Sequence, residues 1–142
     1  MKVVIPGDPV GKGRPRATVI AGHARLYTPS TTAEWEKAAA LLMRQEWAWR
    51  SPLECAVRVE VLAIAARPKR LLRKKDPDGR LWRCAKPDAD NVAKAALDAL
   101  VQAGVLRDDV QVVELVARSL YASRAEGPSV ELTMVELTGD GP

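Results

Sequence analysis

Carboxylates gather in one part of this sequence, KPDADNVAKAALDALVQAGVLRDDVQV, which runs from Lys86 to Val112. Neighbouring carboxylates repel one another unless a cation neutralises them. Mg²⁺ is a natural partner because it prefers oxygen ligands, including water and substrate phosphate. Such a site activates water for attack on a phosphodiester and stabilises the leaving oxygen, while a nearby lysine stabilises the charge of the transition state. The residue types therefore indicate metal-assisted phosphodiester hydrolysis.

A helix from about Asp90 to Ala103 must position these groups, and Gly104 suits its C-terminal cap. Asp90, Lys94 and Asp98 are spaced four residues apart, so they share one helix face. The face that we expect to be buried carries Val92, Ala96, Ala99 and Ala103.

Each acid also has a simpler explanation. Asp88 and Asp90 suit a helix N-terminus, where Asp caps the backbone and the dipole stabilises negative charge. An exposed pair of Asp90 with Lys94 contributes only about 0.3–0.5 kcal/mol. Asp108 and Asp109 follow a short turn, which allows the chain to bring Asp109 back towards the helix.

The remaining pattern predicts an α+β fold for residues 1–142 as a single domain. We expect a strand at 2–5, a loop rich in Pro and Gly, a helix at 31–50 and a strand at 53–65. After the second helix, strands are expected at 110–122 and 129–137, joined by the turn SRAEGP. The predicted order is β-α-β-α-β-β, with a mixed sheet packed against two helices.

The first helix has its own start signal. Thr31 and Glu34 have the spacing of a capping box. Helical spacing relates Trp35, Ala38, Leu42 and Gln45.

Composition narrows the class of protein. The net charge is +4 in 142 residues, a modest excess that favours nucleic-acid binding without requiring it. Cys55 and Cys84 with the single His23 cannot form a zinc site, and we expect reduced thiols. No apolar run has the length of a signal peptide or a membrane span, so we expect a cytoplasmic protein with no membrane partner.

Basic residues are concentrated in two segments that precede the acids, at 12–16 and 67–86. We expect them to contact DNA phosphates, although a plain solvated loop is the alternative for each segment. The candidates are Lys12, Arg14, Arg16, Arg67, Lys69, Arg70, Arg73, Lys74, Lys75, Arg83 and Lys86. Trp82 lies inside the second segment, where we expect it to anchor the loop by packing rather than to stack on a DNA base.

Two stretches of the sequence resemble the RusA family of Holliday junction resolvases. The first is PDADNVAK at 87–94, followed by DAL at 98–100, Gly104 and DDVQV at 108–112. The second joins GKGRPRAT to YTPSTTAEWE and is similar to phage and prophage members. The segment before Pro87 is longer than the family pattern, which affects the expected DNA contacts rather than the chemistry.

The resemblance implies an endonuclease that uses Mg²⁺, with Mn²⁺ as an alternative. It implies a homodimer that cuts four-way DNA junctions by paired, symmetrical hydrolysis in recombination and repair. The implied setting is the bacterial cytoplasm or nucleoid, with the gene carried by a host, phage or prophage. By position, Asp88, Asp90 and Asp109 match the metal-binding acids and Lys94 matches the catalytic lysine. Supporting positions are Asp108, near the metal, and Asn91, near the DNA.

Two other functions fit the same residues. One is a metal-dependent nuclease for flaps, forks or other branched DNA. The other is a structure-specific DNA-binding protein without catalysis, for which the acids would weaken binding. Replacing Asp90 by Asn separates them, because a binder keeps its affinity and a nuclease loses cleavage.

Overall fold

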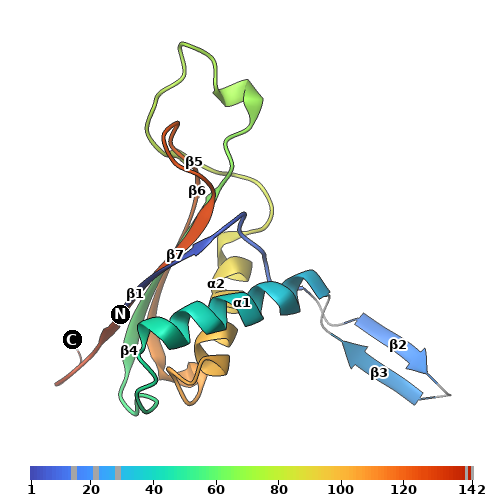
Figure 1. The fold of residues 1–142 in the computed structure, drawn as a ribbon, viewed down its shortest axis with the longest axis vertical. Helices are drawn as coiled ribbons and strands as arrows, with labels where there is room; N and C mark the ends of the chain where they lie inside the picture. Colours follow the sequence, from blue (N-terminus) through green and yellow to red (C-terminus); the bar gives the residue numbers. More distant parts are fainter. Residues whose placement is uncertain (14–15, 21–22, 28–29, 140, 142) are drawn as a thin grey trace.

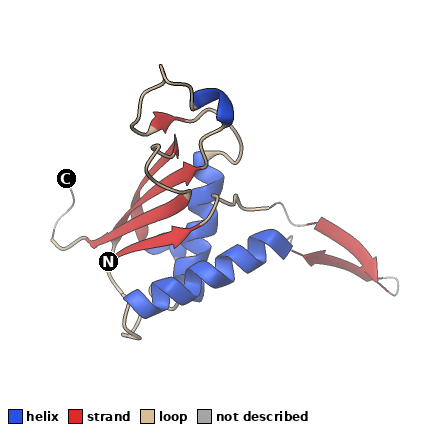
Figure 2. Ribbon diagram, turned by 45° about the horizontal axis from the view of Figure 1, so that its top comes forward, coloured by secondary structure: helices blue, strands red, loops and turns tan. Residues whose placement is uncertain are grey.

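A mixed sheet with two helices on one face makes up most of the molecule (Figures 1 and 2). The computed structural model describes residues 1–13, 16–20, 23–27, 30–139 and 141, with the backbone alone at 16–20 and 23–27. The sheet has the order β1-β7-β4-β6-β5. Its strands are β1 (Lys2–Pro6), β4 (Val57–Ala65), β5 (Leu81–Trp82), β6 (Val112–Tyr121) and β7 (Ser129–Glu136). The helices are α1 (Ser30–Glu46) and α2 (Ala89–Gln102), so the predicted α+β class is confirmed.

Alternation along the central strands builds the core. Val57, Val59 and Val61 of β4 point to the helices and are buried, as are Val130 and Leu132 of β7. The helix α2 meets them with the small side chains predicted for its buried face, Val92, Ala96, Ala99 and Ala103. Small residues allow the helix backbone to lie close to the sheet.

The helix α2 is the crossover between the parallel strands β4 and β6. Parallel neighbours need such a connection because the end of one strand and the start of the next lie at opposite ends of the sheet. The chain leaves β4 through the long loop at 66–86, descends through α2 and returns through β6. Gly104 ends α2 with a φ of 69°, a left-handed conformation that glycine adopts readily. As a result, the start of β6 lies near the end of α2, and the end of β6 lies near the start of α2.

Several predicted boundaries differ from the observed ones. The strands β2 (Arg16–Ile20) and β3 (His23–Tyr27) form a hairpin that the predicted order lacks, and it projects away from the sheet (Figure 1). Because α1 begins at Ser30, Thr31 lies inside the first turn, and the predicted capping box is wrong. The helix ends at Glu46 rather than Arg50, since the chain then takes positive φ angles at Ala48 and Trp49.

The buried face of α1 also differs from the predicted stripe. Ala38 and Gln45 are exposed, whereas Thr32, Glu36 and Met43 are buried. The stripe is displaced because a charged residue, Glu36, points inward to a partner described below. Within the described ranges, neither helix is long and apolar enough to cross a membrane.

Candidate active site

Two predicted site residues lie at the start of α2. Asp88 is the N-cap, and its carbonyl accepts the first helical hydrogen bond from Val92 at 3.1 Å. Its carboxylate makes no capping hydrogen bond, and the residue is exposed. Asp90 is exposed in the first turn, 3.4 Å from the ammonium of Lys94. These carboxylates are therefore accessible to an external ligand.

Side-chain and backbone groups from three other segments hold the entry to α2 in place. Arg83 donates to the carbonyl of Pro87 at 3.0 Å and to the hydroxyl of Ser119 on β6 at 3.1 Å. The backbone N–H of Lys12 donates to the carbonyl of Asn91 at 2.9 Å. Gly11 lies so close that a Cβ there would stand 2.8 Å from that of Pro87. Arg83 and Asn91, both predicted DNA contacts, thus also fix the position of Asp88.

The other two predicted acids lie at the opposite end of α2. A short 3₁₀ turn, η2 (Asp109–Gln111), replaces the predicted start of the strand at Val110. Asp108 caps this turn by accepting from the N–H of Val110 at 2.9 Å. Hydrogen bonding to Asp108, with smaller contributions from burial and from the charges of Asp108 and Asp98, raises the pKa of Asp109. The raised pKa marks an excess of negative charge at this end.

Within one chain, the predicted metal ligands therefore lie at the two opposite ends of α2. The helix between them has 14 residues and spans about 21 Å. The short turn does return Asp109 to the helix, but to Asp98 near its end, and both line one pocket with Lys12 and Asp108. Within the described ranges, no three Asp, Glu, Cys or His side chains lie close enough to share a metal ion.

Lys12 lies between the two helices as a charged bridge. Its ammonium is 2.9 Å from Glu36 on α1 and also pairs with Asp98 on α2. Glu36 is only 4% exposed, and Gln102 donates to its second oxygen at 3.3 Å. Partial burial opposes the charged form of Lys12, but the hydrogen bonds that its ammonium donates to Asp98 and Glu36 outweigh this effect and raise the pKa of Lys12. This predicted DNA contact already has two anionic partners within the chain.

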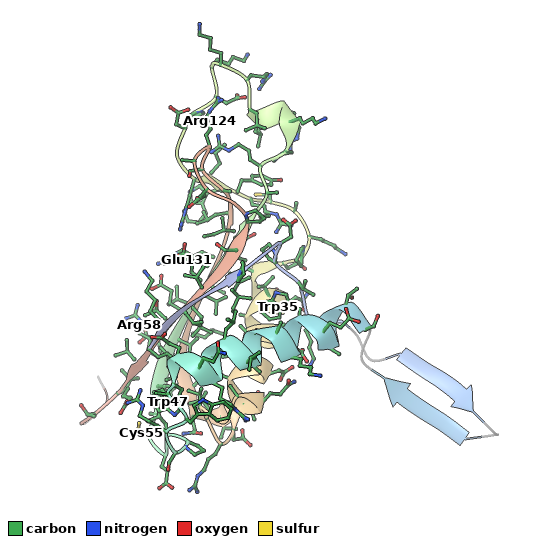
Figure 3. The ribbon with its side chains drawn as sticks, viewed as in Figure 1. Trp35, Trp47, Cys55, Arg58, Arg124 and Glu131 are labelled. Atoms are coloured by element: carbon green, nitrogen blue, oxygen red, sulfur yellow. The ribbon has the colours of Figure 1, made fainter. Side chains whose placement is uncertain are left out.

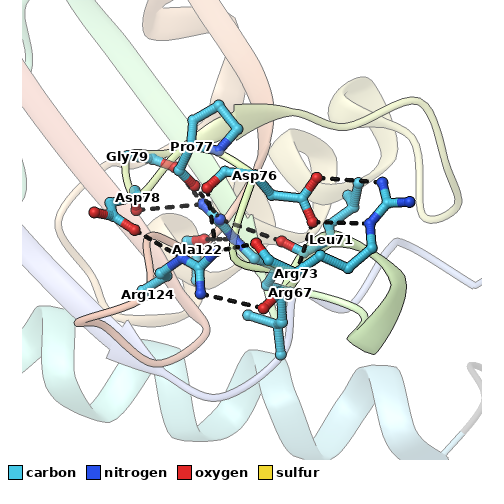
Figure 4. A network of polar contacts seen from close by, with 10 residues as sticks. Arg67, Leu71, Arg73, Asp76, Pro77, Asp78, Gly79, Ala122 and Arg124 are labelled. Atoms are coloured by element: carbon cyan, nitrogen blue, oxygen red, sulfur yellow. Dashed lines mark hydrogen bonds and ion pairs between the residues drawn. The ribbon is translucent and has the colours of Figure 1, made fainter.

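The loop at 66–86, which we name the basic arm, is braced by arginines (Figure 4). Arg67 donates to the carbonyls of Ala122 at 2.9 Å and Pro77 at 2.6 Å. Arg124 donates to the carbonyl of Asp76 at 3.1 Å and pairs with the carboxylate of Asp78 at 2.7 Å. Arg67 is a predicted DNA contact, whereas Arg124 has a bracing role that the sequence did not indicate.

A second cluster fixes the base of the basic arm. Arg80 pairs with Glu126 at 2.8 Å and with Glu131 at 2.6 Å. The hydrogen bond from Arg80, helped by the backbone N–H of Ser123, lowers the pKa of Glu126 to about 2. Arg73 is 3.2 Å from Asp76, so it too has a partner inside the arm.

The other predicted contacts on the basic arm have no ion-pair partner in the described part of the chain. They are Lys69, Arg70, Lys74, Lys75 and Lys86. Side chains ending in nitrogen extend from the end of the arm (Figure 3). Trp82 is 73% exposed, so the prediction that it anchors the loop by packing is wrong. Arg14 lies outside the described residues, and so does the side chain of Arg16, the first residue of β2.

Accessible carboxylates at a helix start, beside an arm with unpaired basic side chains, are typical of an enzyme that acts on nucleic acid. The chain belongs to the RusA family: residues 6–134 match the family described as Endodeoxyribonuclease RusA. A protein of Bacillus subtilis (strain 168), called "Uncharacterized protein YqaN", is 29% identical over 142 residues, which cover 97% of each chain. Endodeoxyribonuclease is therefore the class of this protein, and both ends of α2 and the whole basic arm lie inside the match.

Proposed function

We propose that this protein is a Mg²⁺-dependent endonuclease that resolves four-way DNA junctions as a homodimer. The observation that carries the proposal is the exposed carboxylate of Asp88, which makes no capping hydrogen bond and lies beside Asp90 and Lys94 in a chain of the RusA family. The activity would serve recombination and repair in the bacterial cytoplasm or nucleoid, for a host or a phage.

The donor set fits the proposed metal in its chemistry. Asp88, Asp90 and Asp109 offer the carboxylate oxygens that Mg²⁺ prefers. The raised pKa of Asp109 indicates that a cation would relieve repulsion there. When bound, Mg²⁺ would supply Lewis acidity towards the scissile phosphate. Lys94 would place its ammonium where negative charge develops on that phosphate.

The proposed homodimer would also complete the site. A single chain separates Asp88 and Asp90 from Asp109 by about the 21 Å length of α2. A two-fold axis that sets two α2 helices in opposite directions would bring the start of one near the end of the other. Each complete site would then combine Asp88 and Asp90 of one chain with Asp109 of its partner, and two sites suit paired cuts.

The basic arm supports a branched substrate. Its bracing arginines hold unpaired side chains such as Lys74 and Lys75 away from the sheet, where duplex phosphates would reach them. The exposed indole of Trp82 offers a surface on which an unpaired base at a branch point could stack.

Cleavage of labelled DNA tests the proposal. Wild type, Asp90→Asn and Glu46→Gln would be incubated with a four-way junction, a flap, a fork and linear duplex, with Mg²⁺ or a chelator. We expect paired nicks in the junction, a loss of about 100-fold or more for Asp90→Asn, and no loss for Glu46→Gln, an exposed acid at the far end of α1. Preferential cleavage of flaps or forks would show that these, and not the four-way junction, are the substrate. Binding without cleavage in Mg²⁺ or Mn²⁺ would reject the proposed nuclease activity.

A further inference from the structure

Two hollows adjoin Asp88 in the surface at the start of α2. Their volumes are about 430 Å³ and about 350 Å³, which is the size of the smaller ligand sites in proteins. Both hollows are lined by Asp88 and Lys86, two exposed residues, so the hollows lie side by side. A DNA strand whose backbone crosses Asp88 therefore meets one hollow before that residue and the other after it.

The smaller hollow carries groups that suit a phosphate. It is lined by Gly11, Lys12, Lys86, Pro87, Asp88 and Asn91. The ammonium of Lys12 already pairs with Glu36 and Asp98. Lys86 has no ion pair among the described residues, and there the side-chain amide of Asn91 makes no hydrogen bond. Lysine ammonium and asparagine amide groups are common donors to phosphate oxygens in DNA complexes.

The larger hollow has a different lining, in which small uncharged side chains predominate. It consists of Cys84, Ala85, Ala89 and Ser119, together with Arg83, Lys86 and Asp88. The guanidinium of Arg83 is already occupied, because it donates to the carbonyl of Pro87 and to the hydroxyl of Ser119. This hollow therefore suits the sugar and base of a nucleotide better than its phosphate.

We propose that the two hollows bind the nucleotides on either side of the scissile phosphate, an assignment that rests on the proposed function. In the smaller hollow, Lys86 and the amide of Asn91 bind the neighbouring phosphate. On the other side, the sugar and base pack against Cys84 and Ala85. Lys86 and Asn91 are thus positioning residues: they touch no reacting atom, and they hold the strand so that the scissile phosphate stops at Asp88.

A cycle of protein and DNA variants tests the phosphate subsite without cleavage. A methylphosphonate, which removes the charge of one phosphate, is moved position by position along one strand of a four-way junction near the branch point. Fluorescence anisotropy measures affinity with Mg²⁺ in an Asp90→Asn background. We expect Lys86→Met to weaken binding about tenfold. At one position the methylphosphonate should weaken binding to the same extent, with no further loss when both changes are combined.

Two further variants show whether this coupling is local. Asn91→Ala should couple to the same position as Lys86→Met, since both side chains line the smaller hollow. Lys74→Met is the matched control, because Lys74 is also a lysine of the basic arm without an ion pair in the described ranges. Its effect should add to that of the methylphosphonate at the position that couples to Lys86.

Cross-linking tests the other subsite through a native thiol. Cys84 is exposed, and Cys55→Ser leaves it as the single cysteine of the chain. In the Asp90→Asn background, Cys84 should form a disulfide with a junction that carries a tethered thiol on a base within two nucleotides of the coupled phosphate. The control combines Cys84→Ser with Val135→Cys, which moves the thiol to a 50% exposed position on β7. It should favour no position.

Each outcome supports or overturns the assignment. Additive effects of Lys86→Met with every methylphosphonate overturn the phosphate subsite, and so does a coupled phosphate that does not neighbour the mapped cut. Cross-links no more position-specific than those of Val135→Cys overturn the second subsite. In these cases junction cleavage by wild type would leave the proposed function standing. Conversely, coupling and cross-linking at one place, with no cleavage in Mg²⁺ or Mn²⁺, would support the two subsites and reject the proposed nuclease activity.

Discussion

Among individual residues, Lys12 best separates a structural role from a role in DNA binding. Its ammonium is the cationic partner of Glu36, a carboxylate buried between the helices. Removing one member of such a pair leaves the other charge buried without compensation. Because Lys12 is itself 30% exposed in its side chain, the effect is smaller than for a fully buried pair. We expect Lys12→Met to lower the free energy of unfolding by about 1–3 kcal/mol in urea denaturation.

Lys94→Met is the matched control for stability. Lys94 and Asp90 are each more than half exposed, so the loss of their pair should change stability by less than about 0.5 kcal/mol. Adding Glu36→Gln to Lys12→Met should recover part of the lost stability, since the buried charge is then gone. An unchanged unfolding curve for Lys12→Met, together with weaker junction binding, would instead assign Lys12 to DNA.

Residue identity alone could not divide the basic residues into these two roles. Lys12, Arg67 and Lys74 have the same formal charge, but the first bridges two helices and the second donates to the backbone carbonyls of Pro77 and Ala122. Two of these partners are distant in sequence, since Glu36 lies 24 residues from Lys12 and Ala122 lies 55 residues from Arg67. The acids at 88–109 were easier to place, because caps and helical spacing are local.

At the scale of an element, the basic arm should act as a rigid support for a few lysine and arginine side chains that have no ion pair in the described part of the chain. Lys74→Ala with Lys75→Ala removes two side chains that have no ion pair in the described ranges. We expect weaker junction binding and a slope of log affinity against log salt that is smaller in magnitude by about 2. Each phosphate contact that a lysine makes releases about one counterion, and the variant loses two such contacts. Fluorescence anisotropy at several salt concentrations measures both quantities.

Arg73→Ala is the control for that experiment, because Arg73 already pairs with Asp76 inside the arm. Its slope should match that of wild type. Equal effects of Arg73→Ala and the lysine variant would mean that the arm binds DNA by total charge rather than by the side chains its bracing leaves free.

The elements themselves were predictable where their signals were local. The alternation in β4 and the small-residue face of α2 located both elements, although β4 begins at Val57 rather than Leu53, and Gly104 marked the end of α2. The hairpin β2–β3 lies in a segment dominated by the earlier Pro and Gly signals, and no strand was predicted there. The face of α1 was misplaced because burial of Glu36 depends on Lys12, which lies 24 residues away. Local patterns cannot reveal such a tertiary pair.

At the scale of the whole molecule, the path of the chain explains why one copy is incomplete. The parallel pair of β4 and β6 forces α2 to run opposite to both strands. The acids at the two ends of α2 therefore lie at opposite ends of these strands. The strand β6 covers the whole distance between the two ends of α2. Its ten residues span about 33 Å, which exceeds the length of α2. In the homodimer proposed above, the acids that one copy places at the far end of α2 would come from its partner.

Mixing two inactive variants tests whether the acids of one site come from two chains. In a heterodimer of Asp88→Asn and Asp109→Asn, one shared site would carry both substitutions and the other would carry neither. Each variant alone should be inactive, whereas an equal mixture, after subunit exchange, should regain about one quarter of the wild-type sites. Because each heterodimer has one intact site, the junction should be nicked on one strand without its symmetrical partner. A mixture as inactive as its components, with exchange verified by mass, would place all the acids of a site within one chain.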